Sequence, residues 1–356
     1  MTGPRVLHLT RDFPPRVNGG ISIAVGGIVA ATQDLGANVA VLSFDAWRPR
    51  SRARGSAVSA VDGVMRLRGP ADLEAAQRFT DRFGPDLVHV HAGLLFGSIT
   101  CPAPRVFSVH VGQRRQRLLR SLDRPTKSEV AQARAIANSA VVITPSRCVQ
   151  AEVRASAPRA DVRWVPLGVE PRPRAPGGSE LLYVGRLADI KGTAELFAAM
   201  RQVDAELLVA GGLPDNPRAQ SRWQAQAPNN VRFLGWLDRV ALERRFQSAR
   251  MIVAPSWHET FGLAVAEAMS HGVPAIVSDA GALPERVTHE QSGLIVPARD
   301  PRALAAAITR LATDDDLHER LATGALAAAK AWAWPACGRA LMRIYREFEP
   351  GRSDGI

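Results

Sequence analysis

The chain has 356 residues, of which 46% are hydrophobic and 22% are charged. This length exceeds the usual size of one hydrophobic core, and the apolar content excludes a disordered chain, so we expect two globular domains. The net charge is +11, and residues 1–170 hold 23 Lys and Arg against 13 Asp and Glu. An anionic partner or an arginine-rich genome would each explain this excess.

The sequence contains no apolar run long enough for a membrane span, and it opens with a strand pattern rather than a signal peptide. Its three cysteines lack the spacing of a metal or redox motif, and we interpret them as reduced packing residues. We therefore expect a cytoplasmic protein.

Short apolar strands alternate with helical segments along the first half of the chain. The predicted strands are 5–10, 39–43, 87–91, 105–110 and 141–144, and a helix is predicted over 21–35. Gly19 and Gly20 precede this helix, where glycine lets a phosphate or a sugar approach the backbone. The G-x-G-x-x-G pattern is absent, so a nicotinamide enzyme that uses Asp45 for ribose is the weaker alternative.

The second half repeats the alternation, with strands predicted at 181–185, 207–210, 231–234, 251–254, 275–278 and 294–296. This pattern predicts an α/β protein with two doubly wound parallel sheets, each covered by helices on both faces. We assign residues 1–168 to the first domain, the Pro- and Gly-rich stretch 169–178 to a linker, and residues 179–334 to the second domain. Because such sheets bind ligands at the carboxyl ends of their strands, we expect the two ends to face each other across a cleft.

Histidines stand near the ends of two strands in the first half. His110 ends the strand 105–110, which predicts a side chain that points into the cleft, and a hydrogen-bonded core histidine is the alternative. His89 and His91 lie on one face of their strand, but no third ligand is evident, so no metal site is predicted. The D-x-D pattern of 314–316 lies between two helical segments, and we interpret it as a helix cap.

Two cations, Arg186 and Lys191, follow the first strand of the second half. At the carboxyl edge of a sheet they can hold a diphosphate from two sides. Each cation within about 4 Å of a phosphate contributes roughly 4 kcal/mol at an effective dielectric constant of 20, before desolvation. Two such cations and a helix N-terminus can stabilise a departing diphosphate without a metal.

Two carboxylates eight positions apart flank a predicted helix start at Gly262, with Glu259 just before the helix and Glu267 about two turns into it. The first N–H groups of a helix carry a partial positive charge. This arrangement suits a ligand with hydroxyl groups at both ends and an anionic group between them, which is the layout of a nucleotide diphosphate-sugar.

Several short segments occur in a specific order and spacing: 13–15 with Gly19-Gly20, 86–91, 144–146, 165–169, 184–187 with Lys191-Gly192, Glu259 to Glu267, and 272–274. In these segments, and over 5–348 as a whole, the chain resembles glycosyltransferase family four, which are retaining enzymes of the GT-B fold. The resemblance implies two Rossmann-like domains and a C-terminal helix, 335–356, that crosses back to the first domain.

The resemblance also implies roles for single residues. His110 would contact the sugar and help to arrange the reacting centre, Glu259 would hold sugar hydroxyls, and Arg186 and Lys191 would bind the diphosphate. The remaining donor contacts would come from Gly19 and Gly20, from the backbone N–H groups of Phe261, Gly262 and Leu263, and from Glu267 on the ribose.

These observations favour a retaining glycosyltransferase that needs no metal and no cofactor. It would move a sugar from a nucleotide diphosphate-sugar, with UDP the first expectation and GDP the second, to a hydroxyl of a glycolipid, a polysaccharide precursor or a small metabolite. The alternatives are a sugar phosphorylase, a nucleotide-sugar epimerase and a non-catalytic subunit that binds the donor.

Two arginine clusters, Arg48–Arg54 and Arg114–Arg120, add a possible partner on the acceptor side. They suit a phosphorylated acceptor or anionic lipid headgroups on the inner face of a membrane, and solvated loops are the alternative. Nucleic acid is not expected, because the clusters lack interleaved aromatic side chains.

Overall fold

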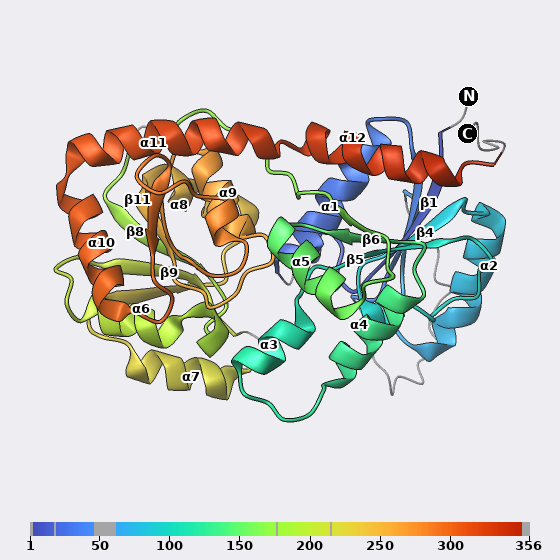
Figure 1. The fold of residues 1–356 in the computed structure, drawn as a ribbon, viewed down its shortest axis with the longest axis horizontal. Coiled ribbons are helices and arrows are strands. Elements are labelled where there is room, and N and C mark those ends of the chain that lie inside the picture. The colour runs from blue at the N-terminus through green and yellow to red at the C-terminus, as the bar shows by residue number, and fades with distance from the viewer. Residues whose placement is uncertain (1–2, 18, 46–61, 176, 214–215, 351–356) are drawn as a thin grey trace. The chain divides into compact units, whose positions relative to one another are not determined.

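The structure is a computed structural model that describes residues 3–17, 19–45, 62–175, 177–213 and 216–350. The chain divides into two compact units, of which the first comprises Met1–Gly168 and Trp334–Ile356 and the second Val169–Ala333. Each unit is built on its own parallel sheet with helices on both sides (Figure 1). No helix of the described residues is both long and apolar enough to cross a bilayer.

The described part of the first unit contains a seven-stranded sheet in the order β3-β2-β1-β4-β5-β6-β7. Its strands are β1 (Arg5–Thr10), β2 (Asn38–Ser43), β3 (Val64–Arg66), β4 (Leu87–Val90), β5 (Arg105–Ser108), β6 (Val141–Thr144) and β7 (Val162–Trp164). Its helices are α1 (Gly20–Gln33), α2 (Leu73–Phe83), α3 (Gln113–Leu119), α4 (Lys127–Ala137), α5 (Arg147–Ser156) and α12 (Trp334–Tyr345). The strand order reverses between β1 and β4.

The second unit contains, within its described residues, a six-stranded sheet in the order β10-β9-β8-β11-β12-β13. Its strands are β8 (Glu180–Gly185), β9 (Leu207–Gly211), β10 (Val231–Gly235), β11 (Ala249–Ala254), β12 (Ala275–Ser278) and β13 (Gly293–Val296). Its helices are α6 (Thr193–Met200), α7 (Pro217–Gln226), α8 (Arg239–Ser248), α9 (Leu263–Ser270), α10 (Pro301–Thr313) and α11 (Asp315–Ala329). Here the order reverses between β8 and β11, and in open α/β sheets such a reversal is where ligands bind.

The two doubly wound parallel sheets agree with the sequence prediction, and the predicted strands lie within about two residues of their observed bounds. The structure adds β3 and β7, which form the two edges of the first sheet. Each has only three residues, so neither produces the apolar run by which a buried strand is recognised.

Alternation along the strands divides the first sheet into two chemically different faces. One face presents apolar side chains such as Leu7, Val88 and Phe107, which pack against α2, α4 and α5. The other face carries polar side chains, including His8 and His89, and is covered by α1 and α12. The first unit therefore buries several polar side chains, among apolar ones such as Val6 and Val41, under its first and last helices.

Helices α1 and α12 approach each other closely because glycines lie at their contact (Figure 1). A Cβ on Gly27 would stand 2.1 Å from the Trp334 ring, and one on Gly338 would stand 2.5 Å from the Ala31 carbonyl oxygen. The C-terminal helix thus packs on the first unit, which confirms the return that the family resemblance implied.

Helix caps in the second unit follow the sequence pattern. Asp300 accepts hydrogen bonds from the backbone N–H groups of Arg302 at 3.0 Å and Ala303 at 2.9 Å. Asp314 caps α11 in the same way, accepting from the N–H of Leu317 at 2.8 Å. The D-x-D pattern is therefore the start of a helix, as predicted from its position.

Candidate active site

Two loops at the carboxyl end of the second sheet bring Lys191 and Glu259 together. The loops follow β8 and β11, which are neighbours at the reversal of strand order. The ammonium group of Lys191 donates to Glu259 Oε1, which also accepts from Ser256 Oγ at 3.0 Å. The two side chains are 23% and 20% exposed, so the ion pair is shielded but still open to a ligand.

Glycines allow these loops to lie so close. Gly192 has φ 68°, and a Cβ there would stand 2.1 Å from the carbonyl oxygen of Pro255. Gly281 has φ 62°, and a Cβ there would stand 2.6 Å from the backbone N and O of Glu259. The backbone of Ala282 donates to the Glu259 carbonyl oxygen at 2.9 Å. Residues from three separate loops therefore hold the ion pair in place.

Arg186 is exposed directly after β8, at the same end of the sheet as Lys191. Its carbonyl oxygen accepts a hydrogen bond of 2.7 Å from the hydroxyl of Tyr183. Tyr183 is buried, and burial together with the Glu259 carboxylate raises the pKa of its hydroxyl. Sequence reasoning did not single out Tyr183, although a tyrosine inside an apolar strand needs a hydrogen-bond partner.

Glu267 lies on α9, but nearer to its start than the sequence predicted. Gly262, with φ 85°, is the N-cap, and the helix begins at Leu263, one residue after the predicted start. Glu267 follows Leu263 by four residues, so it is about one turn into the helix, and the predicted two turns are wrong. The carboxylate is buried and accepts from the guanidinium of Arg239. Burial raises the pKa of the Glu267 carboxyl, and Arg239 opposes this shift. Arg239 is a further site residue that the sequence did not reveal.

Phe261, the residue before this N-cap, is held by contacts in the interior of the second unit. The side chain of Phe261 is buried, and the Arg286 guanidinium lies 4.5 Å from its ring centroid and 4.8 Å from that of Trp332. Burial lowers the pKa of Arg286 to about 10. Because the Phe261 side chain is buried, only the backbone of this residue is available to a ligand, and its contact with a donor stays a prediction.

In the first unit, Gly19 and Gly20 lie at the start of α1. Gly19 is the N-cap, its carbonyl oxygen accepts from Ser22 Oγ at 2.8 Å, and no described atom lies within 4 Å of the place where its Cβ would stand. The preceding loop is anchored by Arg66, which pairs with the buried Asp45 and donates to backbone carbonyls. Asp45 thus has a structural partner, which weakens its alternative role as a ribose ligand.

Four histidines gather near the carboxyl end of the first sheet. His8 Nδ1 lies 2.9 Å from His91 Nε2, and His91 Nδ1 lies 2.9 Å from His110 Nε2. His89 bonds to the Tyr345 hydroxyl at 2.6 Å and to Ser108 Oγ at 2.8 Å. Burial lowers the pKa of His8 to about 3 and that of His110 to about 4, so both rings are neutral at pH 7.

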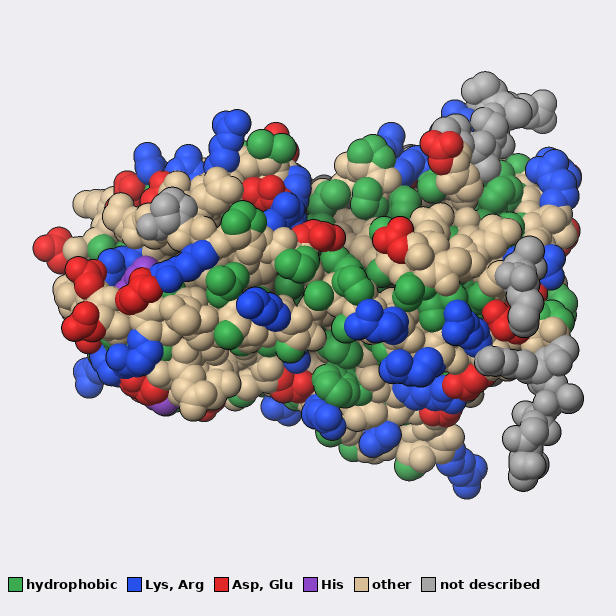
Figure 2. Space-filling model, turned by 90° about the horizontal axis from the view of Figure 1, so that it is seen from above, with side chains coloured by type: hydrophobic (Ala, Val, Ile, Leu, Met, Phe, Trp, Pro, Cys, Tyr) green, Lys and Arg blue, Asp and Glu red, His purple; other side chains and the backbone are tan. Residues whose placement is uncertain are grey.

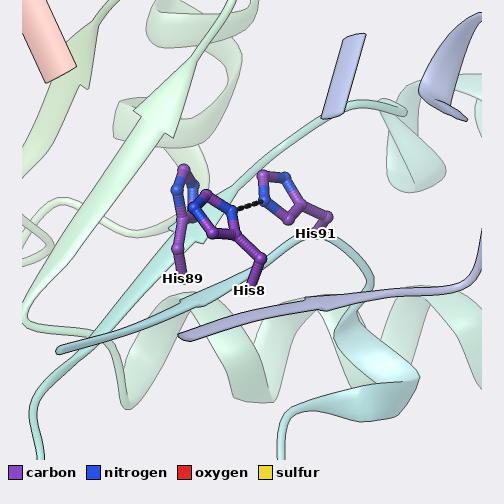
Figure 3. Close-up of side chains that lie close together, drawn as sticks. All are labelled: His8, His89 and His91. Carbon is purple, nitrogen blue, oxygen red and sulfur yellow. Dashed lines mark hydrogen bonds between the residues drawn. The ribbon is translucent and has the colours of Figure 1, made fainter. Parts of the chain in front are cut away.

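The histidine cluster corrects the sequence analysis in one respect. The sequence showed no third ligand for His89 and His91, but β1 supplies His8, and ligand-capable atoms of the three lie within 4.8 Å of one another (Figure 3). His110 is half-buried as a residue, and its ring is hydrogen-bonded to His91 in the core.

The basic cluster around α3 is not a uniform surface. Arg117 donates to Glu129 at 2.7 Å, and both side chains are mostly buried between α3 and α4. Arg114 and Arg120 are exposed, and Leu118 beside them is 51% exposed. The predicted cluster Arg48–Arg54 lies outside the described residues. Figure 2 shows basic side chains on one face interspersed with acidic and apolar ones.

Comparison with known proteins identifies the family. Residues 18–172 match the family model described as Glycosyltransferase Family 4, and residues 178–314 match the model described as Glycosyl transferases group 1. The chain belongs to glycosyltransferase family four. The first match includes Gly19 and His110 of the candidate site, and the second includes Glu259.

Curated members of the family align with part of the chain. The D-inositol 3-phosphate glycosyltransferase of Xylanimonas cellulosilytica is 32% identical over 178 residues, which are 47% of this chain and 42% of that protein. The corresponding protein of Jonesia denitrificans is 29% identical over 184 residues, 48% of this chain and 43% of its own length. The alignments thus span less than half the length of these relatives.

Solved structures match the fold over nearly the whole chain. Sucrose-phosphate synthase from Thermosynechococcus elongatus has a TM-score of 0.81 at 22% identity, covering 97% of this chain and 98% of its own. Anabaena HepE in complex with UDP-glucose has a TM-score of 0.75 at 17% identity, covering 97% and 100%. This member of glycosyltransferase family four therefore has the GT-B fold.

Proposed function

We propose that the protein is a retaining glycosyltransferase that moves a sugar from a nucleotide diphosphate-sugar to a hydroxyl acceptor without a metal ion. The observation that supports this most directly is the partly exposed Lys191–Glu259 pair at the strand reversal of the second sheet. It places a cation for a leaving phosphate beside a carboxylate that can accept hydrogen bonds from sugar hydroxyls.

In this proposal Arg186 and Lys191 stabilise the negative charge that grows on the diphosphate as it leaves. A difference of about 2.7 kcal/mol between transition state and ground state is already about a hundredfold in rate. The N–H groups at the start of α9, from Phe261 to Leu263, supply further positive potential. The ion pair with Lys191 orients Glu259 before the sugar arrives.

The donor's nucleoside would bind nearer to β9 and β10 than its sugar does. Glu267 would hold the ribose hydroxyls, and the segments after these strands would hold the base, where Trp236 exposes 44% of its surface. HepE, which shares the fold, has been solved with UDP and with UDP-glucose, which supports UDP as the first candidate and leaves GDP as the second. We further propose that Gly19, Gly20 and His110 contact the phosphates and the sugar of the donor.

Retention of configuration follows from the same residues in this proposal. Glu259 is engaged by Lys191 and Ser256, so it is better placed to hold hydroxyls than to attack the sugar. We therefore favour a substitution on one face of the sugar, in which the leaving phosphate helps to remove the proton of the acceptor. Nuclear magnetic resonance of the product would show the anomeric configuration, and inversion would contradict this mechanism.

The donor is tested by a thermal-shift series with UDP, GDP, ADP and TDP, followed by turnover of the matching nucleotide-sugars in the presence of EDTA. A rise in melting temperature with one nucleotide and EDTA-resistant transfer are expected. Failure to bind any of them, or turnover only with Mg²⁺ or Mn²⁺, would overturn the proposal. Products that form only with phosphate would indicate a phosphorylase. Conversion of the donor without an acceptor would indicate an epimerase, and binding without turnover would indicate a non-catalytic subunit.

We also propose that the acceptor side contacts an anionic membrane through Arg114, Arg120 and Leu118. Each cation near an anionic surface adds about 1 kcal/mol, and an exposed leucine can enter the headgroup region. Flotation with vesicles that contain phosphatidylserine should fall when Arg114 and Arg120 are both replaced by alanine. The matched control replaces two exposed arginines of α7, Arg218 and Arg222. Equal loss in both double variants, or no flotation at low salt, would remove the membrane from the proposal.

A further inference from the structure

Three histidines form a continuous hydrogen-bonded line from the interior of the first unit to its sheet end. His8 Nδ1 pairs with His91 Nε2, and His91 Nδ1 pairs with His110 Nε2, each at 2.9 Å. Figure 3 shows the first of these bonds, between the middle of β1 and the residue that follows β4. The line reaches His110, the candidate catalytic residue of this unit.

The protons in this line cannot be placed independently. A neutral imidazole has one N–H donor and one acceptor nitrogen, and each bond between two rings needs one of each. Burial keeps the rings neutral near pH 7. Only two arrangements then satisfy both bonds: all three rings carry the proton on Nδ1, or all three carry it on Nε2.

The buried end of the line decides between these arrangements. His8 Nε2 is buried and has no hydrogen-bond partner among the described residues. If the protons were on Nε2, this atom would be a buried N–H without an acceptor, whereas protons on Nδ1 leave there only an unused lone pair. Buried N–H groups without partners are rarer in proteins than acceptors without partners.

We propose that His8, His91 and His110 all carry their proton on Nδ1, and that His8 and His91 are positioning residues that fix His110 as a donor through Nδ1. The consequence for turnover rests on the proposed function: His110 would donate a hydrogen bond to an oxygen of the substrates and could not accept a proton there. The tautomers themselves do not depend on that function.

A metal site formed by His8, His89 and His91 is the competing use of the cluster. Five of the six ring nitrogens of these residues are already hydrogen-bonded, to each other, to His110, to Ser108 or to Tyr345. The three ligands are neutral, so nothing in the triad offsets a divalent charge away from water. These observations favour the hydrogen-bonded line, and metal binding becomes an outcome of the test.

The tautomers are read directly from the ligand-free, full-length protein. Long-range ¹H–¹⁵N correlation spectra of ¹⁵N-histidine-labelled protein at pH 7.5 distinguish a protonated from an unprotonated ring nitrogen. We expect Nδ1–H for all three rings, whereas free histidine prefers Nε2–H. Nε2–H at any of them, or stoichiometric Co²⁺ binding that is lost in His8→Asn, would overturn the proposal.

Two variants of nearly equal shape test the positioning role. The amide introduced by His8→Asn can donate to His91 as His8 Nδ1 does, but the carboxylate introduced by His8→Asp only accepts and should reverse the line. His8→Asp should therefore move the proton of His110 to Nε2 and lower kcat about tenfold, while His8→Asn keeps Nδ1–H and restores turnover. His89→Asn, a change in the same cluster but outside the line, should leave the His110 tautomer unchanged.

An unchanged His110 tautomer in folded His8→Asp would overturn the positioning role, as would an equal change in His89→Asn. If His8→Asp does not fold, the wild-type tautomers still decide the protonation pattern, and loss of Nδ1–H from His110 in His8→Asn would still overturn the positioning role. Absence of transfer activity in the wild-type protein would instead contradict the proposed function, and the spectra would keep their meaning.

Discussion

At the scale of single residues, the Lys191–Glu259 pair joins two parts of the proposed reaction. The lysine would serve the leaving diphosphate and the carboxylate would serve the sugar, and in the structure the two side chains bind each other. The pair keeps both side chains in defined positions until a donor replaces part of their contact. Such preorganisation is the kind of electrostatic contribution that dominates many enzymes.

Lys191→Ala should reduce kcat for nucleotide-sugar turnover by about a hundredfold, because a cation near the leaving phosphate is lost. The fold should remain, since the side chain is partly exposed. Turnover is compared with Arg218→Ala, which removes an exposed cation elsewhere in the second unit. Near-normal turnover of the Lys191 variant would contradict the diphosphate assignment.

Gly192 offers a second residue-scale prediction, with Gly235 as its control. Both have positive φ, 68° and 71°, but only a Cβ at Gly192 would overlap a backbone atom, the carbonyl oxygen of Pro255. Gly235→Ala should lower the free energy of unfolding by about 1–2 kcal/mol, the cost of the left-handed conformation. Gly192→Ala should cost clearly more, as measured by urea unfolding. Equal costs would show that the loop relaxes.

At the scale of secondary-structure elements, α12 is tied to the sheet of the first unit by a buried polar contact as well as by apolar packing. The Tyr345 hydroxyl is fully buried and bonds to His89, which in turn bonds to Ser108 on β5. The last helix, the fourth strand and the fifth strand therefore share one hydrogen-bonded network. This network, together with the apolar packing, joins residues that are far apart in sequence.

Tyr345→Phe should lower the free energy of unfolding of the first unit by about 1–3 kcal/mol, because His89 Nδ1 loses its partner in the core. Thr32→Val on α1 is a suitable comparison, since that buried hydroxyl bonds only to carbonyls of its own helix. Its removal should cost less. The measurement is denaturant unfolding of both variants, and a Tyr345 variant as stable as the wild type would contradict the role of the network.

At the scale of the whole molecule, the two units should respond to acid differently. His8 and His110 have pKa values of about 3 and 4 in the folded protein, against 6.5 for an unperturbed histidine. Between pH 4 and 6.5 the unfolded chain binds more protons, so the stability of the first unit falls as the pH drops below about 6.5. In the second unit the pKa values of His271 and His318 are also lowered, but Glu267 has a raised pKa and acts in the opposite direction.

Hydrogen exchange followed by mass spectrometry at pH 7.5, 6.0 and 5.0 tests this difference. Peptides from β1 and β4 should lose protection at pH 5.0, with each neutral buried histidine contributing up to about 1.4 kcal/mol per pH unit. Exchange rates are corrected for their intrinsic pH dependence. Peptides from β8 and β11 serve as the internal reference. Equal changes in both units would mean that the histidine cluster does not control acid sensitivity.

The sequence by itself determined most strands of this protein and the family to which the chain belongs. Apolar runs marked the buried strands, because strands of a parallel sheet are covered on both faces. Asp300 and Asp314 marked helix starts, because a cap depends on backbone groups two or three residues away. The order of short motifs then indicated a GT-B glycosyltransferase of family four, in agreement with the family models.

Only the tertiary structure decided which polar side chains pair with each other. Lys191 and Glu259 are 68 positions apart, and His8 and His91 are 83 apart, so no local pattern connects them. Arg239 and Glu267 also pair only in the folded chain. The sequence likewise did not show that Arg117 is mostly buried whereas other arginines of α3 are exposed. Contacts of this kind arise where strands and loops pack side by side, and packing depends on the whole chain rather than on neighbouring residues.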